Sequence, residues 1–127
     1  MSIKRDAVYT AVGDALSNID NPCYAKKPPD NVAYPYAVFV ITPSAETQID
    51  TSDDVNLTLT INVWDNNPDS TNLETAVTQI DTALTNTHIT TDKFSAWVQR
   101  GNIGDVPDPD EFVRRTRMTY LLKTRFK

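Results

Sequence analysis

The feature that constrains the fold most is a run of ten residues in which two kinds of side chain alternate. Aliphatic residues occupy every second position from Val55 to Val63, and Asn, Thr or Trp fills each position between them up to Trp64. Successive side chains of a strand point to opposite faces, so a period of two predicts a strand with one buried face. Such a strand requires a sheet and a second layer over its aliphatic side.

Two other segments repeat their apolar residues every three or four positions, which is the spacing of one helix face. We predict an amphipathic helix over residues 2–19, which begins at the capping residue Ser2 and ends before Pro22. A second helix is predicted over residues 70–84. Each helix has one apolar stripe, so both can cover the buried side of the sheet.

Three further strands are predicted from runs of β-branched and aromatic residues, over residues 36–42, 94–102 and 111–126. The first of these is apolar throughout, so we expect it inside the sheet and covered on both faces. Gly101 and Gly104 fit a bend or bulge at the end of the second. Polar loops are expected over residues 21–34, 44–54, 85–92 and 105–110, of which the first and the last contain prolines and the second has room for a short edge strand.

The predicted element order is therefore α-β-β-α-β-β. At 127 residues the chain is long enough for one core and too short for two. We expect an α+β fold in which residues 1–127 form a single domain. Its sheet is mainly antiparallel, and its two helices pack on one face.

The last predicted strand has two different faces. One parity is mostly apolar, and its main members are Phe112, Met118, Tyr120, Leu122 and Phe126. The opposite parity carries a row of basic residues: Arg115, Arg117, Lys123, Arg125 and Lys127. Residues 111–127 hold six basic residues and one acidic residue, whereas the rest of the chain holds six basic and sixteen acidic residues. This separation of charge predicts an electrostatic partner for the basic row.

The reactive side chains argue against an enzyme. His88 is the only histidine, it falls in a predicted loop, and no serine lies in a strand-to-helix elbow that would complete a triad. Three glycines are too few for a phosphate-binding loop. We predict no catalytic residue, no cofactor and no cofactor-binding site. The apolar stretches are too short to cross a bilayer, and the N-terminus lacks a secretory signal, so no membrane partner is expected.

The sequence also gives little support for a metal site or a catalytic thiol. Cys23 is the only cysteine, which excludes an internal disulfide and a cysteine-based zinc site. Lys26 and Lys27 lie close enough in sequence to lower the pKa of its thiol, but a catalytic thiol also needs a base. The acidic segments at 50–54 and 105–111 lack the spacing of a calcium loop, so no metal site is predicted.

Nucleic acid is the other partner that a basic row can bind. The chain as a whole carries a net charge of −5, and no aromatic residue alternates with the basic ones on that face of the strand. An acidic protein surface is therefore the favoured partner.

The order of these elements resembles that of the small tail-terminator, or tail-completion, proteins of long-tailed bacteriophages. The likeness rests on the amphipathic N-terminal helix and four later segments. They are the Tyr-Pro-Tyr start of the strand at 34–40, the end of the alternating strand at 61–65, the helix at 72–84 and the Arg-rich strand at 114–120.

The resemblance implies a structural virion protein that forms a ring, usually of six subunits. Such a ring caps the tail tube, ends its polymerisation and joins it to the head-tail connector at the head-proximal end of the tail. It also implies assembly in the host cytoplasm and a lumen through which DNA passes without specific binding. The basic row would then contact the tail tube or an acidic loop of the neighbouring subunit, made by Asp50, Asp53 and Asp54. The alternatives are a head-tail connector or other neck component and, less favoured, a nucleic-acid-binding module.

Overall fold

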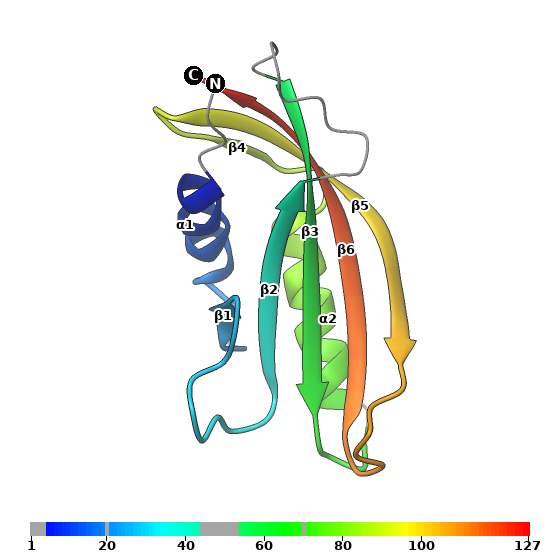
Figure 1. The fold of residues 1–127 in the computed structure, drawn as a ribbon. Coiled ribbons are helices and arrows are strands. Elements are labelled where there is room, and N and C mark those ends of the chain that lie inside the picture. The colour runs from blue at the N-terminus through cyan, green and yellow to red at the C-terminus, as the bar shows by residue number, and fades with distance from the viewer. Residues whose placement is uncertain (1–4, 20, 44–53, 70) are drawn as a thin grey trace.

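The computed structural model describes residues 5–19, 21–43, 54–69 and 71–127. The described chain forms two helices and six strands (Figure 1). The helices are α1 (Arg5–Leu16) and α2 (Thr71–Leu84). The strands are β1 (Cys23–Ala25), β2 (Tyr36–Pro43), β3 (Asp54–Asp65), β4 (His88–Thr90), β5 (Phe94–Val106) and β6 (Arg114–Phe126).

The strands form one mixed sheet in the order β1-β2-β3-β6-β5-β4. All neighbouring pairs are antiparallel except β1 and β2, which run parallel. Two of the predicted loops therefore contain strands: β1 lies within 21–34 and β4 within 85–92. Both are three residues long, too short to show an alternation, and each lies at one edge of the sheet. The observed order is α-β-β-β-α-β-β-β, which corrects the predicted one.

The alternation in β3 is confirmed as the basis of the core. Val55, Leu57, Leu59, Ile61 and Val63 are all buried. In the register with β6, Leu57 lies opposite Leu122 and Leu59 lies opposite Tyr120. The even-numbered residues of β6 therefore share the buried face of β3, as predicted. The two central strands supply the widest part of that face.

Both helices contribute to the same core. Their buried residues are Val8, Val12 and Leu16 of α1 and Leu73, Ala76, Ile80 and Leu84 of α2. Figure 1 shows α2 running along the back of the central strands. The apolar stripes thus cover one face of the sheet, as expected. Strand β2 lies inside the sheet, as predicted, but its second face is only partly covered. Ala37, Phe39 and Ile41 point into the core; on the other face Val38 is buried, whereas Tyr36 and Val40 are half-buried.

The edge of β2 next to α1 is closed by side chains. The Ile41 N–H donates to the hydroxyl of Tyr9 at 2.8 Å, and the Ile41 carbonyl accepts from the Arg5 guanidinium at 3.3 Å. Because unpaired strand edges invite pairing with other chains, these contacts remove one such edge.

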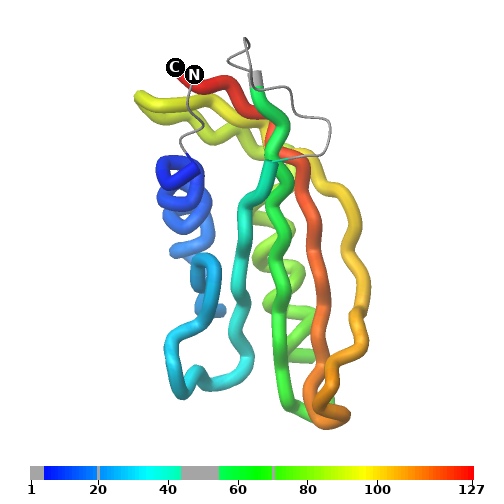
Figure 2. The backbone as a smooth tube through the Cα atoms, viewed as in Figure 1, coloured from blue at the N-terminus to red at the C-terminus, as the bar shows by residue number. Residues whose placement is uncertain are grey.

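The β5–β6 hairpin departs from the prediction at its turn. The register shifts between Arg100 and Ile103, so the expected irregularity is present, but β5 continues to Val106 beyond it. Strand β6 begins only at Arg114, three residues later than predicted. Phe112 therefore lies in the turn and is 75% exposed, rather than in the core. Figure 2 shows this turn and the β1–β2 connection at the same end of the molecule, on opposite flanks of the sheet.

Candidate assembly surface

The sheet face that carries no helix is the candidate functional surface. It is built by the even-numbered residues of β3 and the odd-numbered residues of β6, because the opposite parities form the core. Arg115, Arg117, Lys123 and Arg125 all lie on it, as the sequence predicts. Lys127 does not continue the row. Its ammonium donates to the carbonyl of Thr91 at 2.9 Å and is held at the β4–β5 turn.

The basic residues form two groups rather than one continuous row. Arg115 and Arg117 lie at the start of β6, and Lys123 and Arg125 lie near its end. Arg117 and Lys123 are six positions apart along the strand, which is about 20 Å. This is more than the screening length of about 8 Å at physiological salt. The two groups therefore act as separate positive sites that a partner can contact independently.

Arg117 and Lys123 are the basic residues best placed to meet a partner. Both are exposed, and neither forms a hydrogen bond or ion pair within the described residues. Asn62 lies opposite Arg117 and Asn56 lies opposite Lys123 on β3. From Asn56 to Trp64 the outward positions of β3 hold no acidic side chain, so the centre of this face has a single sign of charge.

The acidic residues predicted to meet the row are only partly described. Asp54 begins β3 and lies in register with Arg125 of the same chain. Arg125 also has an interaction of its own. Asp50 and Asp53 lie outside the described residues.

Aromatic residues from neighbouring strands flank the basic groups, although none alternates with them along β6 itself. The Arg115 guanidinium lies over the ring of Trp64 at 5.8 Å from its centroid, and Trp64 stacks on Tyr36 at 5.2 Å. The Trp64 indole N–H donates to Asp108 at 3.2 Å. Arg115 is half-buried in this position.

A second aromatic site adjoins Lys123. Trp97 of β5 lies opposite Lys123, is 54% exposed and stacks on His88 of β4, with ring centroids 4.2 Å apart. Sequence reasoning missed both contacts because a strand's parity does not reveal its register with the next strand. The only sequence signal for an aromatic side chain near the basic residues was the alternation in β3, which placed Trp64 on the outward face.

His88 is fixed by this packing and by local hydrogen bonds. Its Nε2 lies 2.6 Å from the Ser95 hydroxyl and 3.1 Å from the Thr90 hydroxyl. No carboxylate hydrogen-bonds to the His88 ring within the described residues, so the Ser95–His88 pair does not form a triad. The residue lies in a strand rather than in the predicted loop.

The environment of Cys23 differs from the expectation. Burial raises the pKa of its thiol to about 11, although a hydrogen bond to Asn21 acts in the opposite direction. Lys26 and Lys27, which are close enough in sequence to lower that pKa, therefore do not determine it. At neutral pH the thiol is protonated and a poor nucleophile.

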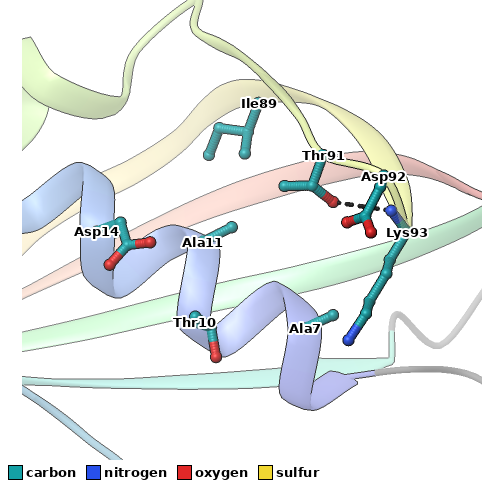
Figure 3. Close-up of a pocket in the computed structure, with 8 residues that line it drawn as sticks. All are labelled: Ala7, Thr10, Ala11, Asp14, Ile89, Thr91, Asp92 and Lys93. Carbon is teal, nitrogen blue, oxygen red and sulfur yellow. Dashed lines mark hydrogen bonds between the residues drawn. The ribbon is translucent and has the colours of Figure 1, made fainter.

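A cavity of about 360 Å³ lies between α1 and the β4–β5 hairpin. Figure 3 shows Ala11 of α1 on the side of the cavity opposite Ile89, Ala7 on the side of Lys93, and Asp14 further along α1. In the described part of the chain no three His, Cys, Asp or Glu side chains gather as a metal site would require. No described helix is long and apolar enough to span a bilayer.

Two helices on one face of a six-stranded mixed sheet, with the other face open and basic, define a small two-layer α+β domain. The chain belongs to the family of tail completion protein gp17, whose model matches residues 5–125. The phage tail-completion family to which the sequence was likened is thereby confirmed. No curated protein matches the chain significantly.

Solved structures share this fold at low sequence identity. A chain described as "Virion of native gene transfer agent (GTA) particle" superposes with a TM-score of 0.81 at 13% identity, over 98% of this chain and 99% of that one. A second solved chain superposes with a TM-score of 0.72 at 14% identity, over 99% of both.

Proposed function

We propose that this protein completes a phage-type tail as a ring of identical subunits, six in number. The ring caps the head-proximal end of the tail tube, stops its polymerisation and joins it to the head-tail connector. Membership of the tail completion family supports a structural role in the tail. A structural neighbour described as a virion particle of a gene transfer agent is consistent with it.

The open sheet face carries the proposal further. Arg117 and Lys123 are exposed at its centre with no partner in the described chain. A separated domain gains nothing from such a one-sign face, whereas an acidic surface on another protein would stabilise it. Arginine suits this task because its planar guanidinium pairs with a carboxylate through two hydrogen bonds. We assign the face to contact with the tail tube or with an acidic surface of the adjacent subunit.

The acidic character of most of the chain is relevant to how DNA would pass through the ring. The protein is acidic outside residues 111–127, and an acidic lining of the lumen would let DNA slide without specific binding. This orientation places the basic face away from the lumen. Assembly would take place in the host cytoplasm, where tail components meet before they join the head.

A charge reversal tests the role of the face. Arg117→Glu and Lys123→Glu, singly and together, should leave the monomer folded, because both side chains are exposed. We expect the double variant to lower the titre of complemented particles at least tenfold and to leave tails of uncontrolled length or without heads. Lys93→Glu is the matched control, because it makes the same charge change at an exposed position in the β4–β5 turn.

The same variants separate the competing functions. If the protein is a neck component, the double variant should lose binding to the portal and keep binding to tail tubes. A nucleic-acid-binding face, which Trp97 beside Lys123 would suit, would show a steep salt-dependent affinity for duplex DNA that the double variant loses. A double variant with wild-type titre would show that the face is only solvated.

A further inference from the structure

Strand β5 has a long edge that no other described strand covers. Strand β4 pairs with only three of its residues. Next to them, the Val98 N–H donates to the Thr87 carbonyl at 2.9 Å, and the Val98 carbonyl accepts from the Asn86 N–H at 3.1 Å. Beyond Val98 no strand of the described chain lies along this edge, and Figure 1 shows the lower half of β5 at the flank of the sheet. The edge is therefore open from Gln99 to Val106, and every residue of this stretch except Val106 is exposed.

The register shows which backbone groups the open edge offers. Both backbone groups of Val98 point away from β6, and this orientation repeats at every second residue of an antiparallel strand, so Arg100 is the next to face the edge. The register shift between Arg100 and Ile103 moves the pattern by one position, which brings Ile103 and Asp105 to the edge. Within the described chain no hydrogen bond reaches the backbone groups of Arg100, Ile103 or Asp105 on this side. An extended segment of another chain can bond to them as an added strand.

The protein closes a strand edge elsewhere but leaves this one open. At β2 the Tyr9 hydroxyl and the Arg5 guanidinium bond to the backbone of Ile41. The edge of β5 has an irregularity at Gly101, but the strand continues in register with β6 as far as Val106. Because an uncovered edge can pair with unrelated chains, proteins usually cover it unless it has a partner of its own.

Two basic side chains of the open sheet face lie next to this edge. Arg117 lies opposite Gly104, and a Cβ atom on Gly104 would meet nothing within 4 Å, so the space over β5 is empty there. An added strand would lie about 10 Å from β6, at two strand spacings, and an arginine and a carboxylate side chain together span that distance. Lys123 lines a cavity of about 320 Å³ with Trp97 and Gln99, at the place where the pairing with β4 stops.

These positions specify the chemistry of the occupant. Arg117 and Lys123 are exposed, have no hydrogen bond or ion pair within the described residues, and lie about 20 Å apart along β6. The matching segment carries two carboxylates about six extended residues apart. A second copy fits poorly, because its edge strands β1 and β4 are only three residues long. A second β5 also brings no acid to this face, since its open-face residues are Gln99, Gly104 and Val106.

We propose that the open edge of β5 accepts an extended acidic segment of a different protein as an added strand, with its carboxylates on Arg117 and Lys123. Main-chain hydrogen bonds provide the affinity of such a contact, and the two basic side chains provide its selectivity. The inference rests on the proposed function, because it states how the open face holds its acidic partner. It favours another component of the tail over the adjacent subunit as that partner.

Hydrogen exchange tests the added strand on the unmodified protein. In the free protein the amides of Arg100, Ile103 and Asp105 should exchange as fast as solvent-exposed amides. In purified tails they should exchange at least tenfold more slowly, because an added strand bonds to them. Asp92 in the β4–β5 turn is the matched control, since its N–H also forms no hydrogen bond within the described chain, and its rate should not change. Unchanged rates at the edge would overturn the added strand, because a contact between side chains alone gives no such protection.

Carbodiimide cross-linking of purified tails identifies the occupant, because this reagent joins an ammonium group directly to a carboxylate. Lys123 should link to an Asp or Glu of a different protein, in a segment with a second acidic residue about six positions away. Lys123→Arg is the matched control, because it keeps the charge and cannot form the link. A link to a second copy of this chain, or no link at Lys123, would overturn the proposed occupant.

A pair of variants at Ile103 separates backbone bonding from side-chain packing. Ile103→Pro removes an N–H that faces away from β6, which an edge strand tolerates. Its incorporation into tails should fall at least tenfold, whereas Ile103→Thr keeps the N–H and should incorporate like the wild type. Equal incorporation of the two variants would overturn the added strand. If Ile103→Pro lowers the unfolding midpoint, the exchange measurement decides, because it needs no variant.

The same tails distinguish failure of this contact from failure of the proposed function. Tails that contain the protein but leave the β5 edge unprotected would overturn the added strand and leave the proposed function in place. Tails of normal length that contain no copies of the protein would overturn both.

Discussion

Gly101 and Gly104 lie three residues apart in β5 and have different surroundings. A Cβ atom on Gly101 would lie 2.9 Å from the hydroxyl of Thr119 and 3.0 Å from its carbonyl oxygen, whereas one on Gly104 would meet nothing within 4 Å. Glycine at 101 therefore allows β5 to approach β6 closely at the register shift.

We expect Gly101→Ala to destabilise the protein by about 1–3 kcal/mol, because a backbone carbonyl cannot move aside easily. Gly104→Ala is the matched control and should be neutral or stabilising by up to about 1 kcal/mol, since it restricts the unfolded chain. Urea denaturation of both variants measures the difference. Equal midpoints would show that β5 and β6 separate freely at this point.

Tyr120 and Asp81 form a polar contact between the buried face of β6 and α2. The buried Tyr120 hydroxyl donates to Asp81 Oδ1 at 2.7 Å, and Arg100 forms an ion pair with Oδ2 at 3.1 Å. Burial alone would raise the pKa of Asp81, but hydrogen bonds from Thr85 and Tyr120 and the charge of Arg100 lower it. Burial, together with the bond to Asp81, raises the pKa of Tyr120.

Tyr120→Phe should cost about 1.5 kcal/mol at pH 7, the lower end for a hydrogen bond to a charged group. A lowered carboxyl pKa stabilises the fold above the unfolded value of about 3.9, and this contribution is lost as the pH falls through the folded value. The difference between variant and wild type should therefore shrink towards pH 3 in urea titrations. A constant difference between pH 7 and pH 3 would mean that the charge of Asp81 plays no part.

Strand β3 shows at the scale of an element what a sequence can predict. Its ten-residue alternation identifies the buried face directly. The alternation from Arg114 to Phe126 identifies the buried face of β6 in the same way. The short strands β1 and β4 were missed because three residues contain no period and their pairing depends on the strand beside them. Trp64 and Arg115 were not predicted to meet, since that contact depends on the β3–β6 register.

Leu59 provides the direct test of the β3 interpretation. It is fully buried between Ile41 of β2 and Tyr120 of β6. Leu59→Ala should lower the free energy of unfolding by about 2–5 kcal/mol, because it removes buried methyl groups and leaves a cavity. Thr60→Ala, one position along on the open face, should cost less than about 1 kcal/mol. A loss below about 0.5 kcal/mol for Leu59→Ala would contradict the burial of this strand.

For the whole molecule, the sequence predicted the family and the two-layer architecture, while several details of the candidate surface came only with the structure. The basic face and its division at Thr119 and Leu121 follow from parity, whereas the contact of Lys127 with Thr91 and that of Arg115 with Trp64 came only with the structure. The exposed position of Phe112 was not foreseen, because the alternation appeared to continue through the turn. Residues of a hairpin turn can continue the alternating sequence pattern of the next strand although they are not part of that strand.

The proposed function requires the protein to form a ring on the end of the tail tube. Negative-stain imaging of the purified protein, alone and mixed with tail tubes isolated from particles that lack it, tests this directly. We expect rings with a central lumen on one end of each tube, and no further growth of those tubes when tail tube protein is added. Tubes that stay bare and continue to grow, while the protein binds isolated portals instead, would contradict the account.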